Sequence, residues 1–285
     1  MMRILVGYNG SEPSRSALED LRNAGLPSAT QVLILSVAEL WTSPRSSDEA
    51  RAIAAHAKQH LNKNFPEWSV YAETASGSPA REILARAETY KPDLIVLGEP
   101  AHVPNDTGVL LGQTSKTILS QAECPVRVAR GTDKGPGGSR ILVGFDGSTA
   151  AIRAVESIVS KTWTVRPEVR LLVVTDLGVL SGADRHTPIE VGAIDMSTVS
   201  QWSQGIANKA LTLLTESGIE ASLVTKLGHA KDEIVAEADK WGADTIFVGP
   251  HGSANSFDRF LLGSVSAAVA ARANCSVEVV RPMTY

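Results

Sequence analysis

The sequence predicts an α/β fold with two doubly wound, Rossmann-like sheets of five parallel strands, each covered by helices on both faces and packed as a pseudo-twofold pair. Two observations lead to this prediction. Short apolar runs alternate with helical patterns along the chain, which is typical of parallel sheets built from strand–helix–strand units. The whole alternation occurs twice in 285 residues. Because crossovers between parallel strands are right-handed, few topologies remain, and the doubly wound one is the default.

The apolar runs of the first copy predict buried strands at residues 3–7, 32–37, 68–74, 94–97 and 126–129. The first run ends at Asn9-Gly10, a typical turn, and Ser11 can cap the helix that follows it. Further helical patterns fill the remaining intervals, at about 47–63, 80–89 and 112–121. Because these helices alternate with the strands, the first copy supplies a complete five-stranded unit.

The second copy repeats the first at two different offsets. Residues 3–11, RILVGYNGS, match residues 140–148, RILVGFDGS, which lie 137 positions later. Gly98 and Gly249 end matching apolar runs, and they lie 151 positions apart. The second copy therefore holds 14 additional residues, the difference between 151 and 137, within 149–227.

The composition favours two globular domains, which we place at 1–130 and 140–285 with a Gly/Pro/Ser-rich linker at 131–139.

Lys and Arg number 27 against 31 Asp and Glu, which argues against nucleic acid or an anionic membrane as partner. No apolar run approaches the ~18 residues of a membrane span. The first residues, Met1-Met2-Arg3, show no signal-peptide pattern, so we expect a cytoplasmic protein. The two cysteines exclude a disulfide scaffold, and we expect both to be small buried residues.

The second copy contains a candidate phosphate-binding segment, from Gly249 to Ser266. In a doubly wound sheet, ligands bind beyond the carboxyl ends of the strands, where this segment begins. Gly249 ends a strand, and Gly252 allows a close approach of backbone amides to a ligand. Gly263-Ser264 opens a helix, whose free N–H groups and positive end favour an anion. The alternative is a glycine-rich loop that only turns a corner, and this segment by itself does not decide between them.

Four short segments resemble the motifs of one protein family. They are VGFDGS at 143–148, GSPAREI at 77–83, GHAKDEI at 228–234, and CPV at 124–126. Their combination resembles universal stress proteins, and the chain is similar over nearly its full length to the tandem type, with two such domains in one chain. The resemblance implies a stress-response protein of the predicted fold.

Some universal stress proteins bind ATP through a glycine pattern that the second copy nearly matches. The family pattern has two residues between the first glycines and nine before Gly-Ser or Gly-Thr, whereas ten residues separate Gly252 from Gly263 here. The resemblance implies that Asp146 reaches the ribose or a phosphate-bound metal, and that the backbone of Val174 reads the adenine edge. The implied ATP-binding set is Asp146, Val174, Val248, Gly249, His251, Gly252, Gly263, Ser264, Val265 and Ser266. Whether Mg²⁺ accompanies the phosphates stays open, and no side-chain metal site is predicted.

Two of these residues have simpler interpretations. Asp146 precedes a glycine, so it can serve only to form a turn. His251 can be an ordinary loop histidine, because no second ligand lies at metal-binding spacing. His56 and His60 do have such a spacing, four residues apart on a predicted helix, but a solvated helix face is the favoured interpretation.

The first copy departs from the ATP-binding pattern. Asn9 stands in place of Asp146, and it lacks the charge that balances a metal. The remaining substitutions are Pro100 for His251, Ala101 for Gly252 and Gln113 for Ser264. We therefore expect a degenerate site that holds no nucleotide.

We expect a sensor or regulator that binds ATP mainly in its second domain, with no catalytic residue assigned. Two alternatives stay open: a nucleotide-free protein-interaction module and a slow ATP hydrolase. The sequence contains no P-loop, dinucleotide-binding or nucleophile-elbow motif. A protein partner and a homodimer are also left open.

Two further expectations concern the arrangement of the copies. We expect them to pair through their last strands, which would bring Arg127 opposite Glu278, its equivalent 151 positions later. We also expect the additional segment 176–195, rich in glycine and apolar residues, to cover the adenine face beside Val174.

Overall fold

The computed structural model describes residues 1–38, 47–100, 111–131, 139–175, 196–251 and 262–282. Several positions that the sequence singled out lie outside these residues. They are the middle of the expected linker, the proposed adenine cover at 176–195, Ala101 and Gly252.

Strands and helices alternate through both copies, as predicted. The first copy contains β1 (Met2–Gly7), α1 (Glu12–Asp20), β2 (Thr30–Ala38), α2 (Ser47–Asn64), β3 (Ser69–Ser76), α3 (Pro79–Tyr90), β4 (Leu94–Gly98), α4 (Gln113–Gln121) and β5 (Val126–Ala129). The second contains β6 (Arg140–Gly144), α5 (Thr149–Ser160), β7 (Glu168–Thr175), α7 (Met196–Glu216), β8 (Glu220–Leu227), α8 (Ala230–Trp241), β9 (Thr245–Val248), α9 (Ser264–Arg272) and β10 (Ser276–Val279). The predicted strands of the first copy differ from β1–β5 by at most two residues at either end.

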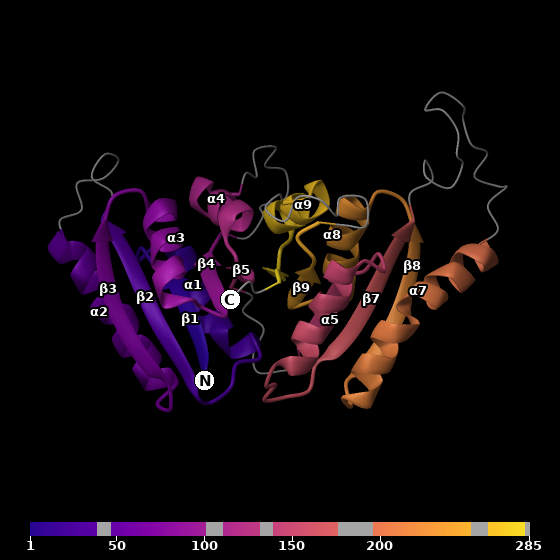
Figure 1. Ribbon diagram of the computed structural model, residues 1–285, viewed down its shortest axis with the longest axis horizontal. Coiled ribbons are helices and arrows are strands. Elements are labelled where there is room, and N and C mark those ends of the chain that lie inside the picture. The colour runs from indigo at the N-terminus through magenta and orange to yellow at the C-terminus, as the bar shows by residue number, and fades with distance from the viewer. Residues whose placement is uncertain (39–46, 101–110, 132–138, 176–195, 252–261, 283–285) are drawn as a thin grey trace, which may run out of the picture.

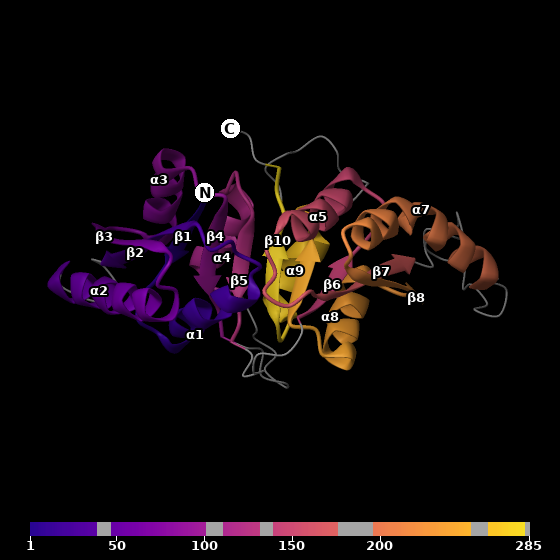
Figure 2. The same cartoon turned by 90° about the horizontal axis from the view of Figure 1, so that it is seen from below.

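The two copies join into one ten-stranded sheet, in the order β3-β2-β1-β4-β5-β10-β9-β6-β7-β8. All neighbours within each half are parallel, and β5 pairs with β10 in the antiparallel sense. Figures 1 and 2 show β5 and β10 in the middle of the molecule and β3 and β8 towards its two ends. The predicted pseudo-twofold pair is therefore confirmed, and its halves meet edge to edge through their last strands.

Side chains of the central strands alternate between core clusters on the two faces of the sheet. Ile4 of β1 packs with Leu18 of α1 and Leu61 of α2. Leu5, the next residue, belongs to a cluster that contains Ile83 of α3. This second cluster also includes residues of α4, α8 and α9, so it is continuous across the junction of the two copies.

The expected pairing of Arg127 with Glu278 is confirmed. The two residues are register partners in the antiparallel β5–β10 pair, and both side chains are buried. Nη1 of Arg127 lies 3.3 Å from Oε2 of Glu278. A contact between equivalent positions of the two copies places the pseudo-twofold axis at this point of the sheet.

Two equivalent arginines, Arg130 and Arg281, each donate a hydrogen bond to a helix of the other copy. Nη2 of Arg130 donates to the carbonyl of Ala270 in α9, at 2.6 Å. Arg281, its equivalent 151 positions later, donates to the carbonyl of Leu119 in α4. Both carbonyls lie near helix C-termini, where the helix dipole favours a cation. Each copy therefore stabilises a helix end of the other.

Two expectations based on composition can be compared with the fold. Cys124 and Cys275 are buried and form no disulfide, which confirms their interpretation as small core residues. Within the described part of the chain, no helix combines the length and apolar character needed to cross a membrane.

Candidate functional site

The predicted site residues lie where strands of the second half end. β6 runs between β7 and β9, so the carboxyl ends of these three parallel strands are neighbours. Asp146 follows β6, Val174 is the next-to-last residue of β7, and Val248 ends β9. The fold therefore gathers these parts of the predicted set at one edge of the sheet, the usual location of ligands in doubly wound proteins.

Asp146 forms a turn that starts α5. Its Oδ1 accepts a hydrogen bond from the Ser148 N–H, at 3.0 Å. Gly147 between them has a φ of 76°, which favours glycine. Ser148 then caps α5, because its Oγ accepts from the Ala151 N–H at 3.1 Å. The turn-forming interpretation of Asp146 is thus confirmed, and its side chain is also exposed at the edge of the sheet.

Gly249 is required by packing, whether or not a ligand binds. A Cβ atom at this position would lie 2.7 Å from the Cβ of Ala150 in α5. Gly98 in the first copy is equally constrained, since its Cβ would lie 2.1 Å from the Pro13 carbonyl oxygen. Strand β9 therefore ends directly against the first turn of α5, and the glycine by itself does not indicate phosphate binding.

The first turn of α9 has the geometry of an anion site. Gly263 is its N-cap and supplies no side chain to the free N–H groups. The Gly263 N–H donates to the carbonyl of Pro250 at 2.7 Å, which fixes the start of the helix. Ser264 is exposed, and Val265 is half-buried. The N–H groups of this turn and the positive end of the helix dipole are suited to a phosphate.

Ser266 differs from its expected role in one respect. Its hydroxyl donates to the carbonyls of Gly249 at 2.6 Å and Pro250 at 3.2 Å, and the residue is 4% exposed. The hydroxyl therefore holds the loop in place instead of facing a ligand. The backbone N–H of Ser266, in the first turn of α9, is then the group of this residue that an anion could accept from.

The other predicted residues form the surroundings of this site. Val174 is half-buried against the core cluster shared by α8 and α9. Val248 is buried at the end of β9, and its carbonyl accepts from the Val280 N–H at 2.9 Å. His251 is half-buried, and it is the last residue after β9 that the structure describes before residue 262. In the described residues, no group of three or more His, Cys, Asp or Glu side chains is arranged to hold a metal.

The first copy has a carboxylate at the corresponding helix end. Oε2 of Glu99 accepts from the N–H of Gly112, the N-cap of α4, at 3.3 Å, and Oε1 accepts from the Ser115 hydroxyl at 2.5 Å. Glu99 is equivalent to Pro250, which carries no charge. Since the Glu99 carboxylate lies at the N-terminus of α4, it would repel a phosphate there.

Sequence reasoning missed Glu99, although the repeat alignment contained a signal. An acidic residue directly after a strand, aligned with a neutral residue in the other copy, predicts a negative charge near a helix N-terminus. The differences at Asn9 and Gln113 had already indicated that the first copy contains a degenerate site.

The fold and the site can now be compared with known proteins. The model of the universal stress protein family matches residues 1–130 and again residues 138–281. The chain belongs to the universal stress protein family. It contains two universal stress protein domains and is therefore of the tandem type, as the sequence predicted.

Individual universal stress proteins are similar over parts of the chain. One from Mycolicibacterium smegmatis is 32% identical over 183 residues, which are 61% of this chain and 57% of the relative. Universal stress protein MJ0531 from Methanocaldococcus jannaschii is 36% identical over 76 residues, 26% of this chain and 44% of the relative. The chain thus matches about half the length of these curated relatives.

Two solved structures share the complete two-domain fold. The crystal structure of a universal stress protein from Archaeoglobus fulgidus has a TM-score of 0.65 at 22% identity, and 98% of each chain is covered. PA1789 from Pseudomonas aeruginosa, a protein of unknown function, has a TM-score of 0.67 at 18% identity, with 99% of this chain and 93% of the other covered. At these identities the likeness concerns the fold.

Proposed function

We propose that this universal stress protein binds ATP mainly in its second domain and acts as a cytoplasmic sensor or regulator. The difference between two equivalent helix ends carries the proposal. In the second domain, α9 begins with Gly263, and the neighbouring Pro250 is uncharged. In the first domain, the Glu99 carboxylate lies at the start of α4. One domain therefore offers an anion site that the other has filled with its own carboxylate.

Each part of the nucleotide would meet groups of a suitable kind. The phosphates would accept from the N–H groups of Ser264, Val265 and Ser266 and from the exposed Ser264 hydroxyl. The adenine edge would face the backbone of Val174, at the end of the neighbouring strand. Asp146, the acidic residue of the assigned set, would lie towards the ribose or a Mg²⁺ ion carried by the phosphates. Because the N–H donors carry no full charge, they suit phosphates whose negative charge is already balanced by a Mg²⁺ ion.

The proposal extends to the organisation of the chain. It places the domains at residues 1–130 and 140–285, with 131–139 as the linker between them. We assign no catalytic residue, so nucleotide binding itself would be the signal. The first domain would then act as a scaffold that pairs with the nucleotide-binding domain.

Thermal unfolding with and without nucleotide tests this function. ATP at about 100 times its dissociation constant should stabilise the folded chain by about 2.7 kcal/mol, whereas cytidine triphosphate should stabilise it less. Equal stabilisation by both nucleotides would contradict recognition of adenine. Absence of any effect would favour the nucleotide-free interaction module, and appearance of ADP during incubation would favour the hydrolase.

A further inference from the structure

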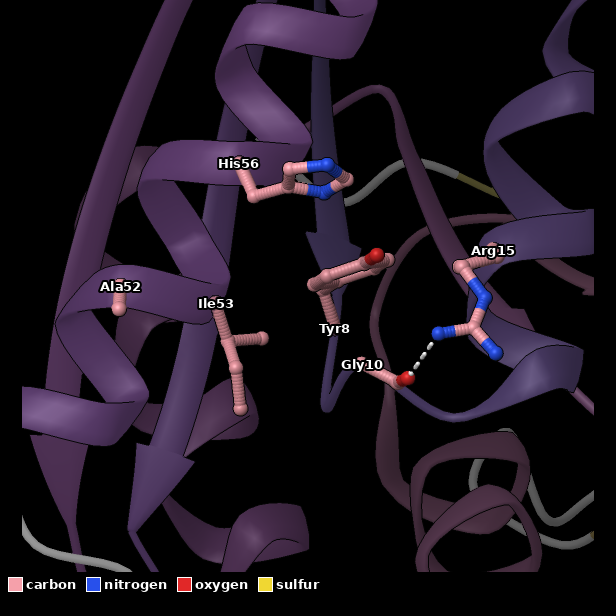
Figure 3. Close-up of a pocket in the computed structure, with 6 residues that line it drawn as sticks. All are labelled: Tyr8, Gly10, Arg15, Ala52, Ile53 and His56. Carbon is pink, nitrogen blue, oxygen red and sulfur yellow. Dashed lines mark hydrogen bonds between the residues drawn. The ribbon is translucent and has the colours of Figure 1, made fainter.

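A cavity lies between α1 and α2 of the first domain, close to the end of β1. Its volume is about 290 Å³, and it is lined by Tyr8, Gly10, Arg15, Ala52, Ile53 and His56 (Figure 3). A second cavity of about 220 Å³ shares Tyr8, Arg15 and His56 with the first. The two cavities thus form one groove with a tyrosine, an arginine and a histidine at its centre.

Tyr8 is a buried residue whose polar end belongs to this groove. It is 4% exposed, yet it lines both cavities. Figure 3 shows the Tyr8 ring between His56 and Arg15. Burial raises the pKa of Tyr8, an effect that the charge of Arg15 partly offsets, so the hydroxyl stays a donor at neutral pH.

Arg15 supplies the positive charge of the groove. Its Nη1 donates to the Gly10 carbonyl at 2.8 Å, which holds the guanidinium beside the cavity and uses one of its five N–H donors. Glu19 lines the second cavity, but it already has two partners: Nε2 of His60 lies 2.7 Å away and Nη2 of Arg22 lies 3.6 Å away. Glu12 also lines only the second cavity. The larger cavity therefore combines a cation with neutral donors, and the two carboxylates of the groove, Glu12 and Glu19, line only the smaller cavity.

The second domain shows that the fold does not require these polar residues. Phe145 is equivalent to Tyr8 and is buried, and Ile152 is equivalent to Arg15 and packs against the core. A Cβ on Gly10 would lie 3.3 Å from Ile53, and a Cβ on Gly147 would lie 3.3 Å from Ile206. Because the two glycines are equivalent, these contacts show that α2 of the first domain and α7 of the second occupy equivalent places in the fold. The polar groups of the first domain thus stand where apolar side chains suffice for folding.

The groove lies on the other face of the sheet from α4, the helix whose start is equivalent to the proposed phosphate site. Tyr8 belongs to the core cluster that includes residues of α1 and α2. A Cβ on Gly7, the preceding residue, would instead meet Ile83 of α3, at 2.8 Å. Successive residues of a strand point to opposite faces of the sheet. The groove therefore opens on the face opposite to α3 and α4, the helices equivalent to α8 and α9.

We propose that this groove binds a small organic carboxylate. The carboxylate would accept from the Arg15 guanidinium and the Tyr8 hydroxyl, because both groups line the same cavity. Ile53 and Ala52 would contact the apolar part of the ligand. His56, at the exposed rim, would add a donor. A compact acid with an apolar body combines these features, whereas a bare inorganic anion would leave the apolar wall unused.

A titration of the full chain with sodium benzoate tests the proposal, with NMR shifts of the His56 ring as the readout. Benzoate should shift the His56 signals to saturation, whereas benzamide and sodium chloride at equal ionic strength should leave them almost unchanged. Equal effects of benzoate and sodium chloride, or no saturation, would overturn the proposal.

Three substitutions make the test specific. Tyr8→Phe reproduces the residue of the second domain, so it should fold, and it should weaken benzoate binding about tenfold through loss of one hydrogen bond to a charged group. Arg15→Gln should abolish saturation. Arg51→Gln, which removes an exposed arginine of α2, is the control and should leave binding unchanged. Unchanged affinity in both Tyr8→Phe and Arg15→Gln would contradict the site, whatever the result for ATP in the second domain.

Discussion

Arg127 and Glu278 face each other across the antiparallel β5–β10 pair, with 3.3 Å between Nη1 and Oε2, and neither is more than 1% exposed. Each has a second partner of opposite charge. Arg127 donates to both carboxylate oxygens of Asp20, at 2.6 and 3.1 Å. Nζ of Lys161 lies 3.1 Å from the other oxygen of Glu278. Two cations and two anions thus balance inside the junction between the domains.

The pKa values of the two cations reflect these contacts. Burial lowers the pKa of Arg127, but Asp20 and Glu278 more than compensate, so its pKa is raised overall. Burial lowers the pKa of Lys161, and Glu278 offsets only part of this effect. Glu278 is therefore the main group that opposes the effect of burial on Lys161, whereas Asp20 is the main one for Arg127.

We expect Glu278→Gln to destabilise the chain strongly. The substitution leaves Lys161 buried without its carboxylate, and breaking a buried ion pair in this way typically costs about 3–5 kcal/mol. Urea unfolding measures the change. Asp48→Asn, which breaks an exposed pair with Arg51, is the matched control and should have little effect. Similar unfolding midpoints for the two variants would show that the junction does not depend on these charges.

Tyr90 should make the chain sensitive to alkaline pH. Burial raises its pKa to about 12, and its hydroxyl donates to the Gln31 carbonyl at 3.2 Å. Because the folded state holds this proton more tightly than the unfolded state, the contribution is present below pH 10 and is lost as the pH rises towards 12. Tyr90→Phe should therefore flatten the loss of unfolding free energy between pH 10 and about pH 12. A slope equal to that of the wild type would exclude Tyr90 as its source.

Glu237 should contribute to stability in the opposite pH range. Burial raises the pKa of Glu237. Lys226 and Arg170, at 2.9 and 2.7 Å, lower this pKa by a larger amount, so the net shift is downward. The contribution is therefore present above the ordinary Glu pKa and is lost as the pH falls through the lower folded-state value. Glu237→Gln should be less stable than the wild type at pH 7, and the gap should narrow in acid. Urea midpoints from pH 7 down to pH 3 would show a constant gap if this linkage were absent.

Glu99 should stabilise α4 by occupying its N-terminus. Glu99→Ala removes a carboxylate from the positive end of the helix, which should cost about 1 kcal/mol. Inorganic phosphate should then restore part of the lost unfolding free energy, because an anion could take the place of the carboxylate. Glu123→Ala, at an exposed position near the other end of α4, is the control. If phosphate stabilised all three proteins equally, Glu99 would not be filling an anion site.

The sequence predicted those parts of the structure that depend on local pattern and on the repeat. Apolar runs located the strands, and the offset of 151 residues between the later parts of the two copies identified Arg127 and Glu278 as equivalent positions. The recruitment of Asp20 and Lys161 was not predictable, because neither residue has an equivalent of like charge in the other copy. Their contacts depend on how α1 and the end of α5 approach the sheet.

The candidate site was predictable to a similar degree. The pattern located Gly263 and Ser264 at a helix start, which the structure confirms. It could not distinguish the Ser266 hydroxyl, which holds the loop, from a ligand donor, because both roles suit a serine in a first turn. The repeat alignment signalled a charge at Glu99, but its contacts with the Gly112 N–H and the Ser115 hydroxyl depend on side-chain geometry that the alignment does not contain.

The most direct test of a single nucleotide site in the second domain is calorimetry of ATP binding to two matched proline variants. Ser264→Pro removes a backbone N–H and a hydroxyl from the proposed phosphate site, yet proline is tolerated at the first position of a helix. Gln113→Pro introduces proline at the equivalent first position of α4 in the first domain and likewise removes a backbone N–H. We predict one ATP per chain, with affinity reduced about tenfold or more by Ser264→Pro and unchanged by Gln113→Pro. Unchanged affinity in Ser264→Pro, or a loss in Gln113→Pro instead, would contradict the assignment of the site to α9.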